Sequence, residues 1–303
     1  MSSLPSLFAN NILPIILIAG VGFLLQRMLR IDPRPLSRVI FYSLTPAFVF
    51  SLLASTEIGA DDIVRMAVFT IIVLVIVGAL SYVVCRALKL ESLTAAAFIL
   101  TATFINSGNY GLSLNSFALG KMGLLWASIF FVTSAMLLNS VGVYVAAVGH
   151  VSPRKALVGL LKVPSVYAIP LALLVRLNDI DLPLALWRPI ELLGSAAVPS
   201  MLILLGMQMA RAGLPKRKDL LLASMGLRMF ASPLIAWFVA NLVGLSGVGR
   251  QAGILESAMP TAVLTTVIAT EYDVEPEFVT GAVLATTLLS PFTLTPLMAI
   301  LGI

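Results

Sequence analysis

A polar, glycine-rich stretch interrupts an apolar segment that is long enough to cross a membrane. The stretch runs from Thr101 to Ser113 and contains two asparagines and two glycines. About 150 residues later, Pro260 interrupts a second apolar segment, four residues after Glu256. Paired interruptions at matching positions in the two halves of a membrane protein indicate a solute site near the bilayer midplane.

The composition excludes an ordinary soluble domain. The chain is 59% hydrophobic and 11% charged, with a mean hydropathy of +1.05, whereas soluble domains carry about 25% charged residues. The first twenty residues lack the basic region of a cleavable signal peptide, so their apolar run is expected to be a spanning helix. The net charge of +5 comes from short loops and gives no reason to expect a nucleic-acid partner.

Segments of about 20 mostly apolar residues are long enough to span a bilayer. Ten segments meet this description, so we expect an all-α membrane protein with ten transmembrane helices. They are residues 11–29, 36–55, 63–84, 93–118, 122–148, 155–175, 187–210, 219–243, 250–271 and 277–301.

The distribution of lysine and arginine predicts the orientation. Thirteen of these residues lie at the connections after the first, third, fifth and seventh segments, and five lie on the opposite side. The positive-inside rule then places both termini outside, and we expect the inner membrane of a bacterium. The connection after the ninth segment is acidic (Glu271, Asp273, Glu275 and Glu277), but acidic residues contribute little to orientation.

Ten segments divide into two sets of five, residues 1–150 and 151–303. An odd number per set means that the second set enters the membrane with inverted orientation. Pro46 lies 153 residues before Pro199 in a similar sequence context, close to the spacing of the two interruptions. We therefore expect two inverted five-helix repeats, with the interrupted segments crossing at the midplane.

The interruptions contain residues suited to binding an anion. Gly108 and Gly111 permit unwinding or close crossing of another backbone, and Pro260 removes a helical hydrogen bond. The new helix N-terminus carries roughly half a positive charge, which suits a carboxylate. Asn106 and Asn109 would add directed donors. Alternatively, these residues only pack and hydrogen-bond the helices together.

Other polar residues in apolar segments leave alternatives open. Glu256 could bind a cation, carry a coupling proton or pair with a buried cation; alternatively it reaches water near Arg250. For Arg228 we favour snorkelling to the cytoplasmic surface over attracting anions into a cavity. Asn139 and Tyr144 are five residues apart, so both face one site only if their helix is distorted; otherwise they are an interhelical asparagine and an interfacial tyrosine.

No catalytic, metal or cofactor motif occurs in the sequence. Cys85 is the single cysteine and His150 the single histidine, which rules out an intramolecular disulfide and a multi-histidine metal site. We therefore expect neither an enzyme nor a protein with a cofactor or metal.

Three stretches resemble motifs of the auxin efflux carrier family, which includes the plant PIN exporters and bacterial carboxylate permeases. Met259–Glu277 resembles the signature of the ninth helix, Asn106–Leu114 that of the fourth and Gly226–Pro233 that of the eighth. The likeness covers essentially the whole chain. Two departures are Ser113, where the family usually has proline, and the short Gly149–Arg154 connection, which favours a minimal bacterial-type carrier.

The resemblance implies a fold related to sodium/proton antiporters and bile-acid symporters. Helices 1, 2, 6 and 7 would form a scaffold domain, and helices 3–5 and 8–10 a transport domain that moves against it. Asn106 and Pro260 would occupy the family's crossover positions, and Asn139 and Tyr144 would face the substrate from the fifth helix. The candidate substrate-binding residues are Asn106, Ser107, Gly108, Asn109, Gly111, Asn139, Tyr144, Pro260 and Thr261, with Glu256 as the coupling-ion candidate.

The leading hypothesis is a secondary transporter of small organic anions, such as malate, malonate or auxin-like acids, with elevator-type alternating access. One alternative is a sodium-coupled symporter of bile-acid-like amphipathic anions. Another is a membrane sensor that binds a ligand without transporting it. The expected partners are the lipid bilayer, the organic anion and a proton or sodium ion; a homodimer remains open as the assembly.

Overall fold

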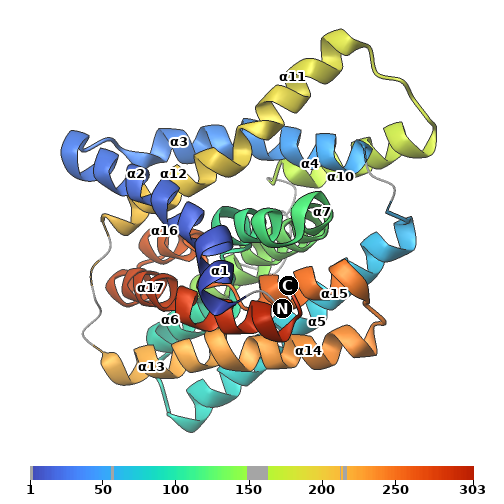
Figure 1. Ribbon diagram of the computed structural model, residues 1–303. Helices are drawn as coiled ribbons and strands as arrows, with labels where there is room; N and C mark the ends of the chain where they lie inside the picture. Colours follow the sequence, from blue (N-terminus) through green and yellow to red (C-terminus); the bar gives the residue numbers. More distant parts are fainter. Residues whose placement is uncertain (1–2, 56–57, 149–162, 212, 214–216) are drawn as a thin grey trace.

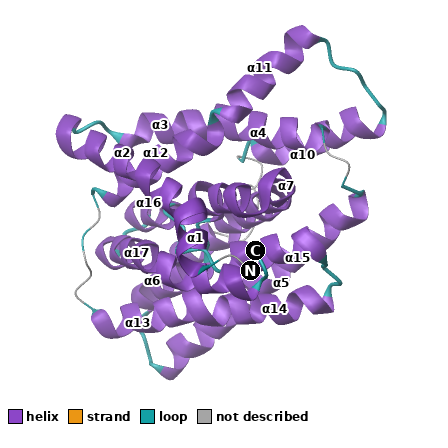
Figure 2. Cartoon of the chain, in the orientation of Figure 1, coloured by secondary structure: helices purple, strands orange, loops and turns teal. Residues whose placement is uncertain are grey.

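The computed structural model describes residues 3–55, 58–148, 163–211, 213 and 217–303. Throughout these residues the regular elements are helices, without a strand (Figure 2). The expectation of an all-α fold is therefore confirmed. The Gly149–Arg154 connection and the first part of the predicted segment 155–175 lie outside the described residues.

In the first half of the chain, short π-helical turns, written η, join α-helices. A kink at Gly120 (φ 65°, ψ −155°) separates the predicted segments 93–118 and 122–148. The elements are α1 (Leu4–Leu7), η1 (Phe8–Ile12), α2 (Leu13–Leu29), α3 (Pro33–Val39), η2 (Ile40–Leu44), α4 (Thr45–Ala54), α5 (Ala60–Ala87), α6 (Ser92–Thr103), η3 (Ser107–Leu112), α7 (Ser113–Leu137), η4 (Leu138–Gly142) and α8 (Val143–Ala146).

The second half of the chain is also built from α-helices, with a π-helical turn between two of them. The predicted segment 250–271 is divided into two helices, as its proline indicated. The elements are α10 (Ser165–Leu177), α11 (Leu184–Ser195), α12 (Ala197–Met209), α13 (Lys218–Gly226), η6 (Leu227–Ala231), α14 (Ser232–Leu242), α15 (Gly247–Ser257), α16 (Leu264–Glu271) and α17 (Pro276–Ile300).

Within the described residues, seven helical stretches are long and apolar enough to cross a membrane, and Ser92–Thr103 and Ser165–Leu177 are shorter apolar helices. The chain is thus an integral membrane protein, while its division into ten spans in two inverted repeats stays a prediction. The seven stretches are Leu4–Leu29, Pro33–Ala54, Asp61–Ala87, Ser107–Ala146, Leu184–Met209, Lys218–Leu242 and Pro276–Ile300.

Three of the π-helical turns have a common cause in proline. The turns η1, η2 and η6 each end two residues before a proline, namely Pro14, Pro46 and Pro233. Proline has no N–H group and its ring clashes with the carbonyl one turn earlier. A turn widened by one residue displaces that carbonyl, so the helix continues across the proline with a local bulge.

The helices form two groups by their contacts. In one group, α2 packs on α12, and α4 packs on α10 and α11; in the other, α5 and α15 pack on α7, and α14 packs on α5 and α15. Figure 1 shows the first group as a layer in blue and yellow along the top, with α13, α14, α15 and α5 below and α7 between them. The turn η3 contacts α12, so the first interruption lies where the two groups meet.

Polar contacts place four connections on one side of the protein. Arg211 and Asp32 form an ion pair of 3.4 Å, which joins the connection after α2 to the one after α12. Thr94 donates to Glu275 Oε1 at 2.7 Å and accepts from Arg217 Nη1 at 3.4 Å. The acidic connection before α17 is therefore linked through Thr94 to the basic connection that contains Arg217.

Two glycines allow α2 and α12 to cross at close range. A Cβ atom on Gly206 would overlap the backbone of Ala19, and one on Gly22 would overlap the backbone of Ile203. Small residues at such crossings let helix backbones approach in a membrane, where van der Waals packing drives association. This contact fixes the two helices as one unit.

We predict that Gly206→Ala destabilises the protein by about 1–3 kcal/mol, the usual cost of overpacking. Gly20→Ala is the matched control, because it lies on α2 with nothing within 4 Å of its added methyl group. Thermal unfolding of the detergent-solubilised variants measures both effects. Equal midpoints for the two variants would contradict the close crossing.

Candidate functional site

The two helix interruptions meet in a short antiparallel backbone bridge. After α6, Phe104 adopts an extended conformation (φ −91°, ψ 137°), and Ile105 pairs with Thr261 of the second interruption. The Asn106 N–H donates to the Pro260 carbonyl at 2.8 Å, and the Ala262 N–H donates to the Phe104 carbonyl at 2.9 Å. Each unwound segment thus satisfies backbone groups of the other in a region without water.

Thr261 strengthens the bridge from inside the protein. It is fully buried, and its hydroxyl donates to the Thr101 carbonyl at 2.8 Å. Its N–H donates to the Thr286 hydroxyl at 3.1 Å, which brings α17 into the same network. The side chain of this predicted substrate-binding residue is occupied in holding the two interruptions together.

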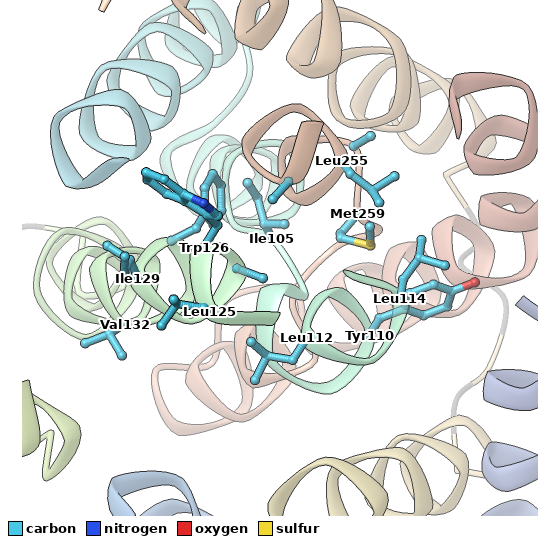
Figure 3. Packing of buried hydrophobic residues seen from close by; sticks show 14 of the residues in the cluster. Ile105, Tyr110, Leu112, Leu114, Leu125, Trp126, Ile129, Val132, Leu255 and Met259 are labelled. Atoms are coloured by element: carbon cyan, nitrogen blue, oxygen red, sulfur yellow. The ribbon is translucent and has the colours of Figure 1, made fainter. Parts of the chain in front are cut away.

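Apolar side chains enclose the bridge. Figure 3 shows Ile105 of the first interruption between Leu255 of α15 and Met259 of the second interruption on one side and Trp126 of α7 on the other. Polar contacts in such surroundings are stronger than in water, and unpaired polar groups are correspondingly costly. The bridge is therefore part of the protein core.

Arg228 binds the carbonyl ends of both interrupted helices. Its guanidinium donates to the carbonyls of Ala102 (3.3 Å) and Thr103 (2.8 Å) at the end of α6. It also donates to the Ser257 carbonyl at the end of α15 and to the Ser232 hydroxyl. The expectation that Arg228 snorkels to the surface was wrong: the side chain is 0% exposed, because these carbonyls, which have no helical partner, replace water.

The helices that begin after the two interruptions, η3 and α16, present free N–H groups at their N-terminal ends. Hydrogen bonding in η3 begins with the Gly111 N–H, which donates to the Asn106 carbonyl at 3.1 Å. The N–H groups of Ser107, Gly108 and Asn109 consequently have no acceptor within their own helix. The beginning of α16 lies across the bridge from this helix start. Helix N-termini favour negative charge, so both ends suit an anion.

A cavity of about 120 Å³ lies against these N-termini. Among its lining residues, the Asn106 Nδ2 and Gln208 Oε1 atoms are buried without a hydrogen-bond partner. A buried polar group without a partner is unfavourable, so both atoms are poised for a ligand. The lining residues are Ser37, Ile40, Phe41, Thr45, Ile105, Asn106, Ser107, Gly108, Asn109, Phe131, Ser134, Ala135, Leu138, Asn139, Met201, Leu204, Gln208, Ala262, Val263, Leu264 and Val267.

The structure brings some of the predicted residues to the cavity and leaves others away from it. Five of them line it, namely Asn106, Ser107, Gly108, Asn109 and Asn139. The Asn139 Nδ2 atom donates back to the Ala135 carbonyl at 2.8 Å. Pro260 and Thr261 form the bridge behind the cavity. Tyr144 is 41% exposed and does not line the cavity, although the π-helical turn η4 supplies the distortion between it and Asn139.

Gly111 lies in η3, the turn that contributes Ser107, Gly108 and Asn109 to the cavity wall, and it packs against Glu256. A Cβ atom at Gly111 would overlap the Glu256 carboxyl group, which is 0% exposed. Asn115 Nδ2 donates to Glu256 Oε1 at 3.1 Å and to the Gly111 carbonyl at 2.9 Å. Glu256 Oε2 and Asn115 Oδ1 lack partners, and no basic side chain of the described residues lies within 4 Å of the carboxyl group.

Sequence reasoning missed Asn115 and Gln208. Both are amide side chains inside apolar segments, the same signal that singled out Asn106. Without the fold, nothing separates an amide that faces a cavity from one that only bonds to its own helix, as Asn11 does with the Leu7 carbonyl at 3.0 Å. The tertiary structure makes that distinction, through the contact of Asn115 with Glu256 and the position of Gln208 in the cavity wall.

A bundle of membrane-length helices, with two interrupted helices beside a polar cavity, is the architecture of membrane transport proteins. A family model described as "Membrane transport protein" matches residues 7–298, and the chain belongs to this family. The predicted membership of the auxin efflux carrier family is confirmed. Members of this family are transporters.

Two archaeal relatives cover most of the chain. It is 25% identical over 286 residues to an uncharacterized transporter of Methanothermobacter thermautotrophicus, covering 93% of this chain and 94% of the relative. It is 24% identical over 268 residues to an uncharacterized transporter of Methanocaldococcus jannaschii, covering 84% and 85%.

We predict that Gly111→Ala destabilises the protein because its methyl group collides with the Glu256 carboxyl group. The expected cost is about 1–3 kcal/mol. In a Glu256→Ala background the collision is removed, so the same glycine substitution should cost clearly less. A double-mutant cycle on thermal unfolding measures this coupling, and a cost that is equal in both backgrounds would refute the contact.

Proposed function

We propose that the protein is a secondary transporter of small organic anions. The observation that carries this proposal is the cavity, where the unpartnered Asn106 Nδ2 atom lies beside the free N–H groups that start η3. These donors suit the oxygens of a carboxylate. The volume of about 120 Å³ supports malate- or malonate-sized acids over bile-acid-like anions, since pockets for drug-sized ligands measure about 300–1,000 Å³.

Elevator-type movement is the mechanism that we propose. The cavity separates two sets of helices: η3, α7 and α16 line one side, and α3 to α4 and α12 line the other. A second cleft, of about 340 Å³, lies toward the opposite ends of the same segments, between Ser116 and Lys121 on one side and Ser51 and Trp187 on the other. Sliding of one helix set along the other would carry a bound anion between the two clefts.

We further propose that residues 1–150 and 151–303 are inverted five-helix repeats. Support comes from the antiparallel pairing of Ile105 with Thr261, because an inverted relation requires equivalent segments to run in opposite directions. The connections joined through Asp32, Thr94 and Glu275 would face the cytoplasm of a bacterium, where the positive-inside rule puts basic loops. Helices 1, 2, 6 and 7 would be the scaffold.

Coupling to a proton at Glu256 completes the proposal. A buried, unpaired carboxylate is very unfavourable in an apolar interior, and a proton on Oε2 would remove that charge. Asn115 presents an N–H donor to Oε1, which suits a carboxyl group better than it suits a sodium ion. Gly111 and Asn115 form hydrogen bonds that connect this carboxyl group with Asn106, so proton binding would be communicated to the cavity.

We predict that Asn106→Ala raises the KM for anion uptake at least tenfold, because a hydrogen bond to a charged group contributes about 1.5–3 kcal/mol. The KM is measured from uptake into proteoliposomes of labelled malate, malonate, short monocarboxylates and indole-3-acetate. Asn241→Ala, at an exposed site of α14, is the control. An unchanged KM would refute the site, and binding of an acid without flux would favour the sensor alternative.

For Glu256→Gln we predict uptake that no longer responds to a proton gradient, because the amide cannot take up the coupling proton. Wild-type uptake should accelerate when the exterior is made acidic relative to the interior. Measuring both proteins with imposed proton and sodium gradients separates the ions. Stimulation of the wild type by sodium alone, abolished in Glu256→Gln, would replace the proton with sodium.

A further inference from the structure

Among the described residues, no charged side chain lines the cavity proposed for an anion. All of the lining residues are apolar, small or neutral polar groups. Moving a carboxylate out of water without a compensating charge is very costly. The positive charge that makes the site tolerable for an anion has to lie behind its wall.

Arg228 is a buried cation that binds the Thr103 carbonyl, two residues before Ile105 of the cavity wall. It extends from η6 into the junction between α6 and α15 and is 0% exposed. In the described part of the chain, no carboxylate forms an ion pair with it within 4 Å. Its partners are three backbone carbonyls and one hydroxyl, so its charge is not cancelled by an acidic side chain.

Helix dipoles determine what this charge does. The C-terminal ends of α6 and α15 each carry roughly half a negative charge, and the N-terminal ends that face the cavity each carry roughly half a positive charge. Without Arg228, these four ends would cancel and leave the junction close to neutral. The guanidinium neutralises the two carbonyl ends and leaves the N-terminal ends as the net positive pole.

We propose that Arg228 is the countercharge for the transported anion, acting from behind the junction of the interrupted helices. It is a positioning residue: it touches the helix ends, and these present the donors to the anion. This inference rests on the proposed function, and it deepens that function by assigning the electrostatic source of anion selectivity to a residue outside the cavity.

The expected size of the effect follows from distance. Arg228 binds the Thr103 carbonyl, and the three residues from there to Asn106 span at most about 11 Å. At about 12 Å and an effective dielectric constant near 20, one unit charge changes anion affinity about tenfold, which corresponds to about 1.4 kcal/mol. The KM for the anion should report this change.

Glu256 provides the competing explanation. It is also fully buried and precedes Ser257, whose carbonyl accepts from Arg228. If Arg228 served only to offset a charged Glu256, replacing Glu256 with glutamine would remove the need for it. If Arg228 acts on the anion, its substitution should matter equally in both backgrounds.

The test compares Arg228→Lys, Arg228→Met and Arg228→Gln in proteoliposomes, each in the wild-type and the Glu256→Gln background. The probe is labelled malonate, or the acid of the panel above that the wild type takes up fastest. Arg250→Met is the matched control, since Arg250 stacks on Trp237 at 4.3 Å and does not line the cavity. KM and the maximal rate are determined separately, together with monodispersity and thermal unfolding.

We expect the two neutral variants to raise the KM about tenfold in both backgrounds, Arg228→Lys to stay within about threefold of the wild type, and Arg250→Met to leave the KM unchanged. A lower maximal rate with an unchanged KM would assign Arg228 to folding and overturn the proposal. So would neutral variants that are never monodisperse while Arg228→Lys folds. An effect that vanishes in Glu256→Gln would overturn it in favour of pairing with Glu256.

The wild type separates this inference from the function on which it rests. If the wild type takes up none of the acids, the proposed function fails and the inference fails with it. If the wild type takes up an acid and the neutral variants keep its KM, only the role of Arg228 is overturned.

Discussion

Backbone polar groups inside an apolar bundle have to be satisfied by other protein groups, since neither lipid nor water is available to do so. Interrupting two helices exposes such groups at four ends. Here the two unwound segments pair through Ile105 and Thr261, and the remaining carbonyls at the ends of α6 and α15 are bound by Arg228. The cavity, its free donors and its position between two groups of helices all depend on this mutual satisfaction.

The same arrangement separates charge within the protein. Carbonyl ends and a guanidinium lie on one side of the backbone bridge, and helix N-termini face the cavity on the other. Glu256 is held near the cavity wall by Asn115 and Gly111 without a basic partner within 4 Å among the described residues. An unpaired buried polar group is costly in such surroundings, so these groups support the proposed transport site.

Close packing outside the site makes this arrangement rigid. The crossing of α2 and α12 at Gly22 and Gly206 leaves no room for a side chain, and the π-helical turns let helices continue past prolines. The group that contains α2 and α12 therefore forms a tightly packed wall of the cavity. The half of the cavity lined by η3 and α16 faces this group, which is the division that the proposed elevator movement requires.

The sequence by itself determined the membrane-spanning, all-helical class, the family and the positions of both interruptions, because apolar length, glycine and proline act locally along the chain. It singled out Asn106, which lines the cavity, but it did not indicate that the Asn106 Nδ2 atom has no hydrogen-bond partner. Only the tertiary structure decided that Arg228 is buried rather than snorkelling, that Gln208 faces the cavity and that Tyr144 does not. Those outcomes depend on which carbonyls, cavities and helix faces meet across more than a hundred residues, and no local pattern carries that information.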